Sequence, residues 1–117
     1  MKPTRRLTYA VDYDHTFTAD PEATREMVAN LQRRGHVCVL VTGRSDDNGW
    51  GDAVRRDVGT LMPIVFAGGT WKRDAAARAG YPVDIWVDDS PEGIRPADVA
   101  MVEMRNRATY AKQRGGK

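Results

Sequence analysis

The stretch Leu7-Thr8-Tyr9-Ala10-Val11-Asp12-Tyr13-Asp14-His15-Thr16 joins a short apolar run directly to two acidic residues. The apolar run is typical of a buried strand. Side chains alternate along extended backbone, so Asp12 and Asp14 are predicted to point the same way at the carboxyl end of that strand. Open α/β sheets bind their ligands at this edge. The pair predicts either a site with two carboxylates or a solvated acidic turn, and the rest of the chain has to distinguish them.

The composition indicates one soluble domain. The chain has 117 residues, of which 41% are hydrophobic, and a net charge of +2, which suits a single core. No apolar stretch approaches the length of about 18 residues that spans a membrane. No secretory signal is recognisable, and we expect a cytoplasmic protein that does not bind membranes. The single cysteine, Cys38, is predicted to be a buried thiol, which leaves no disulfide or thiolate zinc site.

Basic residues gather at the C-terminus. Residues 105–117 carry five cations and no acid. We expect a single catalytic domain over residues 1–104, followed by a basic tail that is frayed or disordered. Such a tail either binds a polyanion through its phosphates or is a plain solvated terminus.

Strand and helix patterns alternate through the whole chain. The predicted strands are 7–11, 36–41, 62–67, 83–87 and 99–102. The predicted helices run from about Pro21 to Arg34, from about Trp50 to Val58, and from Thr70 to Gly80. Asp20 and Thr70 are the predicted N-caps. This order predicts an α/β domain of doubly wound, three-layer Rossmann-like type with a mostly parallel five-stranded sheet.

Residues with useful chemistry follow four of the predicted strands. After Asp12 and Asp14 come Thr42-Gly43-Arg44, then Lys72, then Asp88-Asp89. Parallel strands place their carboxyl ends at one edge, so these residues are predicted to meet in one crevice. Four neighbouring carboxylates would be partly protonated unless a cation lay among them, and Mg²⁺ prefers carboxylate and water oxygens. The sequence therefore predicts a magnesium site formed by the four acids.

The remaining residues of this edge are donors that suit a phosphoryl group. They are Lys72, the Thr42 hydroxyl and the backbone N–H groups of Gly43 and Arg44, and phosphoryl transfer depends mainly on such positioning and charge neutralisation. Each has an alternative role. Thr42 is otherwise a turn cap, Lys72 a solvated helix residue, and Arg44 either grips substrate or forms an ion pair nearby. In the catalytic interpretation, Asp12 attacks phosphorus to give an aspartyl-phosphate.

These segments resemble the four motifs of the haloacid dehalogenase-like superfamily of phosphotransferases. The resemblance covers about residues 7 to 102. The first motif, D-x-D-x-T after a hydrophobic strand, matches Asp12–Thr16, and the second, a threonine ending a strand, matches Thr42. The third motif, a lysine, matches Lys72, and the fourth, paired acids after a strand, matches Asp88-Asp89.

The resemblance implies a Mg²⁺-dependent phosphatase. Asp12 would be nucleophile and metal ligand, and Asp14 would be the general acid and base, with its backbone carbonyl on Mg²⁺. Asp88 or Asp89 would complete the coordination, and the threonine and lysine of the second and third motifs would bind phosphate. An acid at position 14 favours phosphatase or mutase chemistry, because the dehalogenases of the family lack it and its transport ATPases carry threonine there.

The gaps between the motifs are too short for a cap domain. About 30 residues separate Asp14 from Thr42, and a similar number separate Thr42 from Lys72. An open site is covered by a large substrate, such as a nucleic-acid end, or by a neighbouring subunit of a homo-oligomer, and small phosphomonoesters also remain candidates. The basic tail and Arg44 favour a nucleotide or polynucleotide phosphate. Trp50 and Trp71 near the rim are either substrate contacts or core residues.

Two alternatives come from other functional classes. A receiver-type signalling module also uses Asp, Thr and Lys on a parallel sheet. It carries its acid pair after the first strand and its phospho-acceptor after the third, whereas here the third strand leads into Ala67-Gly68-Gly69. The second alternative is a catalytically silent protein that binds metal or phosphate.

Overall fold

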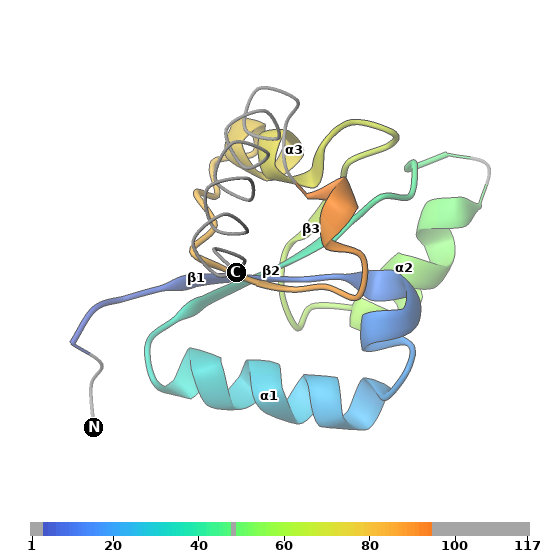
Figure 1. The fold of residues 1–117 in the computed structure, drawn as a ribbon. Helices are drawn as coiled ribbons and strands as arrows, with labels where there is room; N and C mark the ends of the chain where they lie inside the picture. The colour runs from blue at the N-terminus through green and yellow to red at the C-terminus, as the bar shows by residue number, and fades with distance from the viewer. Residues whose placement is uncertain (1–3, 48, 95–117) are drawn as a thin grey trace, which may run out of the picture.

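A parallel sheet with helices on both faces forms the body of the protein (Figure 1). The computed structural model describes residues 4–47 and 49–94. Within them the sheet has four strands in the order β3-β2-β1-β4, and every pair is parallel. The strands are β1 (Thr8–Val11), β2 (Val37–Thr42), β3 (Ile64–Phe66) and β4 (Ile85–Val87). The predicted fifth strand, 99–102, and the basic tail, 105–117, lie outside the described residues.

The last two strands are shorter than predicted. For β4, the reason is the side chain of Asp84, which accepts a hydrogen bond from the Thr8 N–H at 2.8 Å, while the Asp84 N–H donates to the Thr8 carbonyl at 2.9 Å. Because the Asp84 side chain accepts from the Thr8 N–H, that N–H does not bind a backbone carbonyl of the neighbouring strand. Regular pairing of β4 therefore begins at Ile85. For β3, Pro63 precedes the first paired residue and has no N–H to give to the ladder.

Three α-helices connect the strands, namely α1 (Pro21–Arg33), α2 (Trp50–Val58) and α3 (Lys72–Arg78). The α1 helix begins as predicted, because the Asp20 carboxylate accepts a hydrogen bond from the Ala23 N–H at 3.0 Å. The predicted cap of α3 is wrong. Trp71 occupies the N-cap position, and the Thr70 hydroxyl instead donates to the Ala67 carbonyl at 2.7 Å, closing the turn after β3. Among the described residues, no helix has the length and apolar character needed to cross a membrane.

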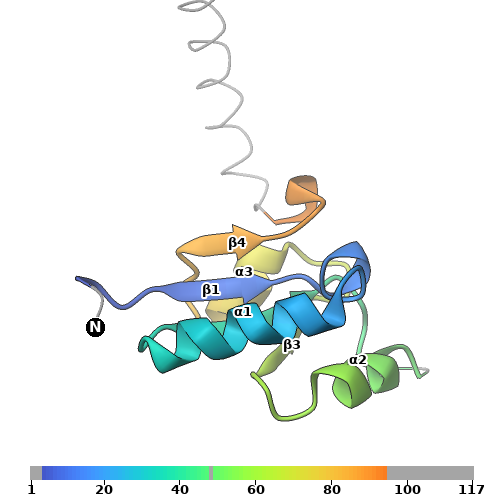
Figure 2. The same ribbon diagram turned by 90° about the horizontal axis from the view of Figure 1, so that it is seen from below.

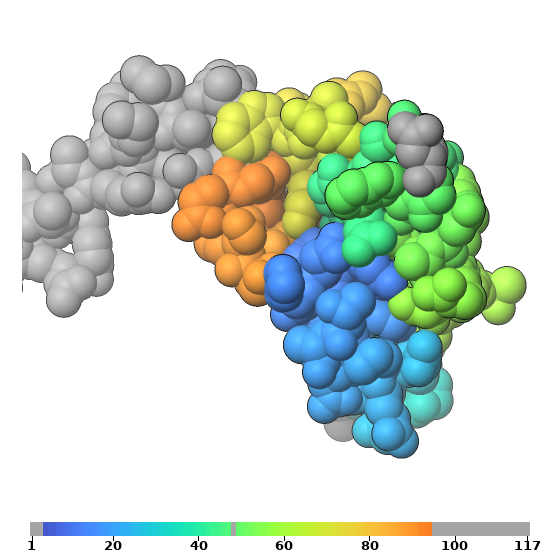
Figure 3. Space-filling model, turned by 90° about the vertical axis from the view of Figure 1, so that its right-hand side faces the viewer, coloured from blue at the N-terminus to red at the C-terminus, as the bar shows by residue number. Residues whose placement is uncertain are grey.

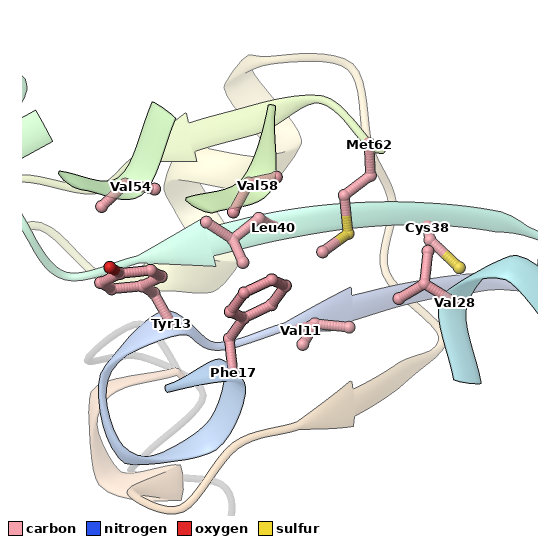
Figure 4. Close-up of a cluster of buried hydrophobic side chains, with 9 residues drawn as sticks. All are labelled: Val11, Tyr13, Phe17, Val28, Cys38, Leu40, Val54, Val58 and Met62. Atoms are coloured by element: carbon pink, nitrogen blue, oxygen red, sulfur yellow. The ribbon is translucent and has the colours of Figure 1, made fainter. Parts of the chain in front are cut away.

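The central strand β2 is buried on both faces, as its continuous apolar sequence predicts. Leu40 and Cys38 point to the side covered by α1 and α2, and Val39 and Val41 point to the side covered by α3. Figure 2 shows the helices on the two sides of the sheet. Figure 4 shows the larger core cluster, which is formed by Val11, Tyr13, Phe17, Val28, Cys38, Leu40, Val54, Val58 and Met62. Cys38 is a buried thiol, as predicted, and burial raises its pKa.

Strand register brings the ends of β1 and β4 to the same level, while β2 continues two residues further, to Thr42. Val11 pairs with Leu40 on one side and with Val87 on the other. The next residue, Asp12, continues the ladder for one more step, because its N–H donates to the Val87 carbonyl at 2.9 Å. The residues that follow these strands therefore emerge together at the carboxyl edge of the sheet.

Candidate active site

A tight turn directly after β1 presents both acids of the first segment. Asp12 is still extended, and a turn over Tyr13–Phe17 follows it, closed by the Phe17 N–H, which donates to the Asp12 carbonyl at 3.1 Å. Among the described non-glycine residues, only His15 has a positive φ, 65°, a conformation that costs energy and is concentrated at functional sites. The turn buries Tyr13 and Phe17 and leaves Asp12 and Asp14 lining one cleft. The two acids thus share a site because of this turn, and not because of strand alternation.

Lys72 lies at the centre of the site, between two carboxylates from different strands. Its Nζ is 2.8 Å from Asp12 Oδ1 and 2.7 Å from Asp88 Oδ2. The side chains of Lys72, Asp12 and Asp88 are 10%, 6% and 1% exposed, so the interpretation of Lys72 as a solvated helix residue is wrong. Burial works to lower the lysine pKa, but the hydrogen bonds to both carboxylates outweigh it and raise the pKa.

Opposing effects act on the pKa of the Asp12 carboxyl. Burial raises its pKa, the hydrogen bond with Lys72 lowers it, and a hydrogen bond with Asp89 raises it again, which places the pKa at about 6. The Thr16 hydroxyl lies 3.3 Å from Asp12 Oδ2 and 3.5 Å from Asp89 Oδ1. Burial is the largest cause of the raised pKa, and the neighbouring carboxylates of Asp89 and Asp88 add to it.

Three of the four predicted metal ligands form an acidic cluster. Oxygens from Asp12, Asp88 and Asp89 all lie within 4.8 Å of one another. Asp88 Oδ1 also accepts the Ser90 N–H at 2.9 Å, which orients that side chain. With three carboxylates against one ammonium, a hard divalent cation would balance the charge, and the oxygen donors suit Mg²⁺. The Asp14 carboxylate does not belong to this cluster, which leaves only its backbone carbonyl as the predicted ligand.

Arg44 binds Asp14 in the structure. Its Nε and Nη2 donate to the two carboxylate oxygens at 2.9 and 2.8 Å, the fork geometry that arginine favours. This hydrogen bond with Asp14 raises the arginine pKa. The guanidinium also lies 5.0 Å from the centre of the Tyr13 ring and 5.6 Å from that of the Trp50 ring. Of the two roles considered for Arg44, the ion pair is observed, and substrate binding stays a prediction.

Thr42 is the last residue of β2, and Gly43 follows it at the cleft. Thr42 is fully buried, and its hydroxyl accepts the Arg44 N–H at 3.2 Å, the contact expected of a turn cap. Gly43 lines the cleft, and a side chain there would first meet Lys72 Cε, at 3.9 Å. The roles of Thr42 and Gly43 in binding phosphate stay predictions.

The cleft itself has a volume of about 440 Å³. Its lining is formed by Asp12, Asp14, His15, Gly43, Arg44, Trp50, Lys72, Asp89 and Ser90. Figure 3 looks onto this edge, where the turn after β1 (blue), the loop after β2 (green) and the segment after β4 (orange) gather. A second hollow of about 280 Å³ adjoins it and shares Gly43, Arg44 and Trp50. Most of the predicted site residues therefore line one open cleft.

A partly buried contact between Tyr13 and Asp57 was not predicted from the sequence. The Tyr13 hydroxyl donates to the Asp57 carboxylate on α2. Burial, together with this hydrogen bond, raises the pKa of Tyr13 to about 12, and the same hydrogen bond lowers the pKa of Asp57. Since the Tyr13 ring packs against Arg44, the contact connects α2 to the ion pair at Asp14. No spacing rule relates positions 13 and 57, so the sequence carries no signal for it.

Comparisons of the chain with protein-family models, with curated proteins and with solved structures found no match. The resemblance to the haloacid dehalogenase-like superfamily therefore rests on the motif residues. The fold and the cleft supply the physical context in which those residues can be judged.

The titration of Tyr13 tests the contact with Asp57. Its folded pKa of about 12 lies above the ordinary value of 10.0, so the stability it contributes is present below pH 10 and is lost as the pH rises toward 12. The variant Tyr13→Phe is expected to lose the highest tyrosine component in an ultraviolet absorbance titration. It is also expected to lose about 1 kcal/mol of unfolding free energy, because the Asp57 carboxylate, which is 33% exposed and also accepts from Arg56, loses one of its hydrogen bonds.

The matched variant Tyr81→Phe removes a hydroxyl from another tyrosine and is expected to keep that component. Persistence of the component near pH 12 in Tyr13→Phe would show that Tyr13 is not its source.

Proposed function

We propose that this protein is a Mg²⁺-dependent phosphomonoester hydrolase, a capless phosphatase of haloacid dehalogenase-like type with a Rossmann-like fold. One observation carries the proposal: the buried carboxylate of Asp12 lies in an open cleft, hydrogen-bonded to Lys72 at 2.8 Å and beside the acids that follow β4. A buried acid held in place by a lysine suits nucleophilic attack on a phosphate ester.

The first step would be carried out by Asp12 and Asp14. A carboxylate oxygen of Asp12 forms a bond to phosphorus, the bond from phosphorus to the leaving oxygen breaks, and Asp14 gives that oxygen a proton. In the second step Asp14 takes a proton from water, whose oxygen attacks the aspartyl-phosphate. The bond from phosphorus to Asp12 then breaks, and the products are inorganic phosphate, the alcohol and the unchanged enzyme.

The acidic cluster would hold the metal ion. Asp12, Asp88 and Asp89 have oxygens close enough together to share a cation. When bound, Mg²⁺ neutralises charge on the phosphoryl oxygens. Lys72 both orients Asp12 and offers a cation to a phosphate oxygen.

Arg44 would fix the proton-transferring group. Both oxygens of Asp14 are held by its guanidinium, and this determines where the carboxylate stands relative to Asp12. Asp14 remains 43% exposed, so a leaving oxygen and a water molecule can reach it. Arg44 donates to both carboxylate oxygens of Asp14. When one of these oxygens carries the proton, its hydrogen bond with the guanidinium has to lengthen.

Release of phosphate from p-nitrophenyl phosphate by the full chain tests the proposal. We expect Mg²⁺-dependent turnover that EDTA abolishes, and a loss of about a hundredfold or more in kcat for Asp12→Asn, because the nucleophile is removed. The matched variant Asp52→Asn changes an aspartate that is 79% exposed on α2 and is expected to keep full activity.

Circular dichroism of each variant shows whether the fold is retained. Turnover by a folded Asp12→Asn at the rate of the unchanged protein would refute the proposal. A single phosphorylation without turnover would favour the signalling module instead.

A comparison of two phosphate esters with different leaving groups tests the role of Asp14. Nitrophenolate departs without help, whereas an alkoxide needs a proton as it leaves. For Asp14→Asn we therefore expect the rate of aspartyl-phosphate formation in single-turnover measurements to fall by about a hundredfold with glycerol phosphate and by clearly less with p-nitrophenyl phosphate, whereas the later hydrolysis step, which also uses Asp14, slows equally for both. An equal fall in the rate of formation with both esters would assign Asp14 another role.

A further inference from the structure

Trp50 is an exposed aromatic residue at the junction of the two cavities. Its side chain lies at the start of α2, is 60% exposed, and lines both the catalytic cleft and the second hollow. The interpretation of Trp50 as a core residue is therefore wrong. An exposed aromatic side chain that lines a cavity is available to contact a ligand bound there.

The indole ring is held in a defined position. Arg44 Nη1 donates to the Trp50 carbonyl at 3.0 Å, and the guanidinium lies against the ring. The following residue, Gly51, is packed so closely that an added Cβ would lie 3.2 Å from Phe66 Cε1 on β3. Since Arg44 also binds Asp14, the ring stands at a fixed place relative to the group that is proposed to protonate the leaving oxygen.

The second hollow offers hydrogen-bonding groups beside this ring. Its wall contains the backbone of Gly68 and Gly69, which have φ of 56° and 88°, a conformation that favours glycine. At Gly69 an added Cβ would meet nothing within 4 Å among the described residues. Ser45 and Asp47 add a hydroxyl and a carboxylate to the lining. The hollow therefore combines an aromatic face with polar groups at its edge.

We propose that the two cavities form one substrate site, in which the leaving group is a nucleoside whose base stacks on Trp50. This rests on the proposed phosphatase function. A nucleobase has both a π face for the indole and polar edges for Ser45, Asp47 and the glycine backbone. A sugar phosphate lacks the face, and the ring of a phosphotyrosine lacks the polar edge. A free nucleotide and the terminal nucleotide of a nucleic acid share this chemistry.

The test compares two substrates across two tryptophan variants of the full chain. Nucleoside monophosphates carry a base, and ribose 5-phosphate does not. We expect Trp50→Ala to lower kcat/KM for the nucleotides by about tenfold more than for ribose 5-phosphate, because only the nucleotides lose a stacked base. Trp50→Phe should retain most of the activity.

The matched control is Trp71→Ala. Trp71 is also exposed, at 36%, and stands at the start of α3, but it is not among the described residues that line either cavity. It is expected to leave both substrates unchanged. An equal loss with both substrates in Trp50→Ala, or no loss with either, would overturn the proposal.

Two further substrates distinguish the remaining kinds of leaving group. Oligonucleotides with a 3′-phosphate show whether the base belongs to a nucleic-acid end or to a free nucleotide, and dependence on Trp50 in either case supports the proposal. Preference for a phosphotyrosine peptide that depends on Trp50 would overturn it. If no ester releases phosphate, the proposed function fails, and quenching of Trp50 fluorescence by adenosine, absent in Trp50→Phe, decides the stacking by itself.

Discussion

The ammonium of Lys72, buried between Asp12 and Asp88, holds the site together. Each of the three groups comes from a different element, and each would be costly to bury alone. Asp12 follows β1, Asp88 follows β4, and Lys72 begins α3 on one face of the sheet. Their mutual contacts therefore fix the helix against two strand ends. Removing the lysine would leave two buried carboxylates without a positive charge beside them, and breaking a buried pair in this way costs about 3–5 kcal/mol.

This interaction also explains why the site suits a cation. Lys72 compensates only part of the negative charge, because Asp89 adds a third carboxylate to the cluster. The pKa of about 6 at Asp12 reflects burial together with that imbalance. A divalent cation would favour the ionised form of Asp12, the form that can act as a nucleophile. Structural stability and the proposed chemistry thus depend on the same charges.

Much of this arrangement could be predicted from the sequence, because it follows from strand order. The apolar run of β2 identifies a central strand, and parallel pairing then brings Asp12, Lys72 and Asp88 to one edge. The partner of Arg44 could not be predicted. It depends on the turn at His15, whose positive φ has no signal in the residue type, and on a side chain 30 positions from Asp14. The exposure of Trp50 likewise depends on tertiary packing, since tryptophans at helix starts are usually core residues.

The measurement that tests the central claim most directly is the location of phosphate on the protein during turnover. The full chain would be mixed with p-nitrophenyl phosphate and Mg²⁺, quenched in acid, reduced with borohydride and digested for mass spectrometry. Borohydride converts an aspartyl-phosphate to homoserine, which marks the residue that was phosphorylated. We expect the mark at Asp12 and its loss in Asp12→Asn. Steady hydrolysis with no mark, or with the mark on another residue, would contradict that claim.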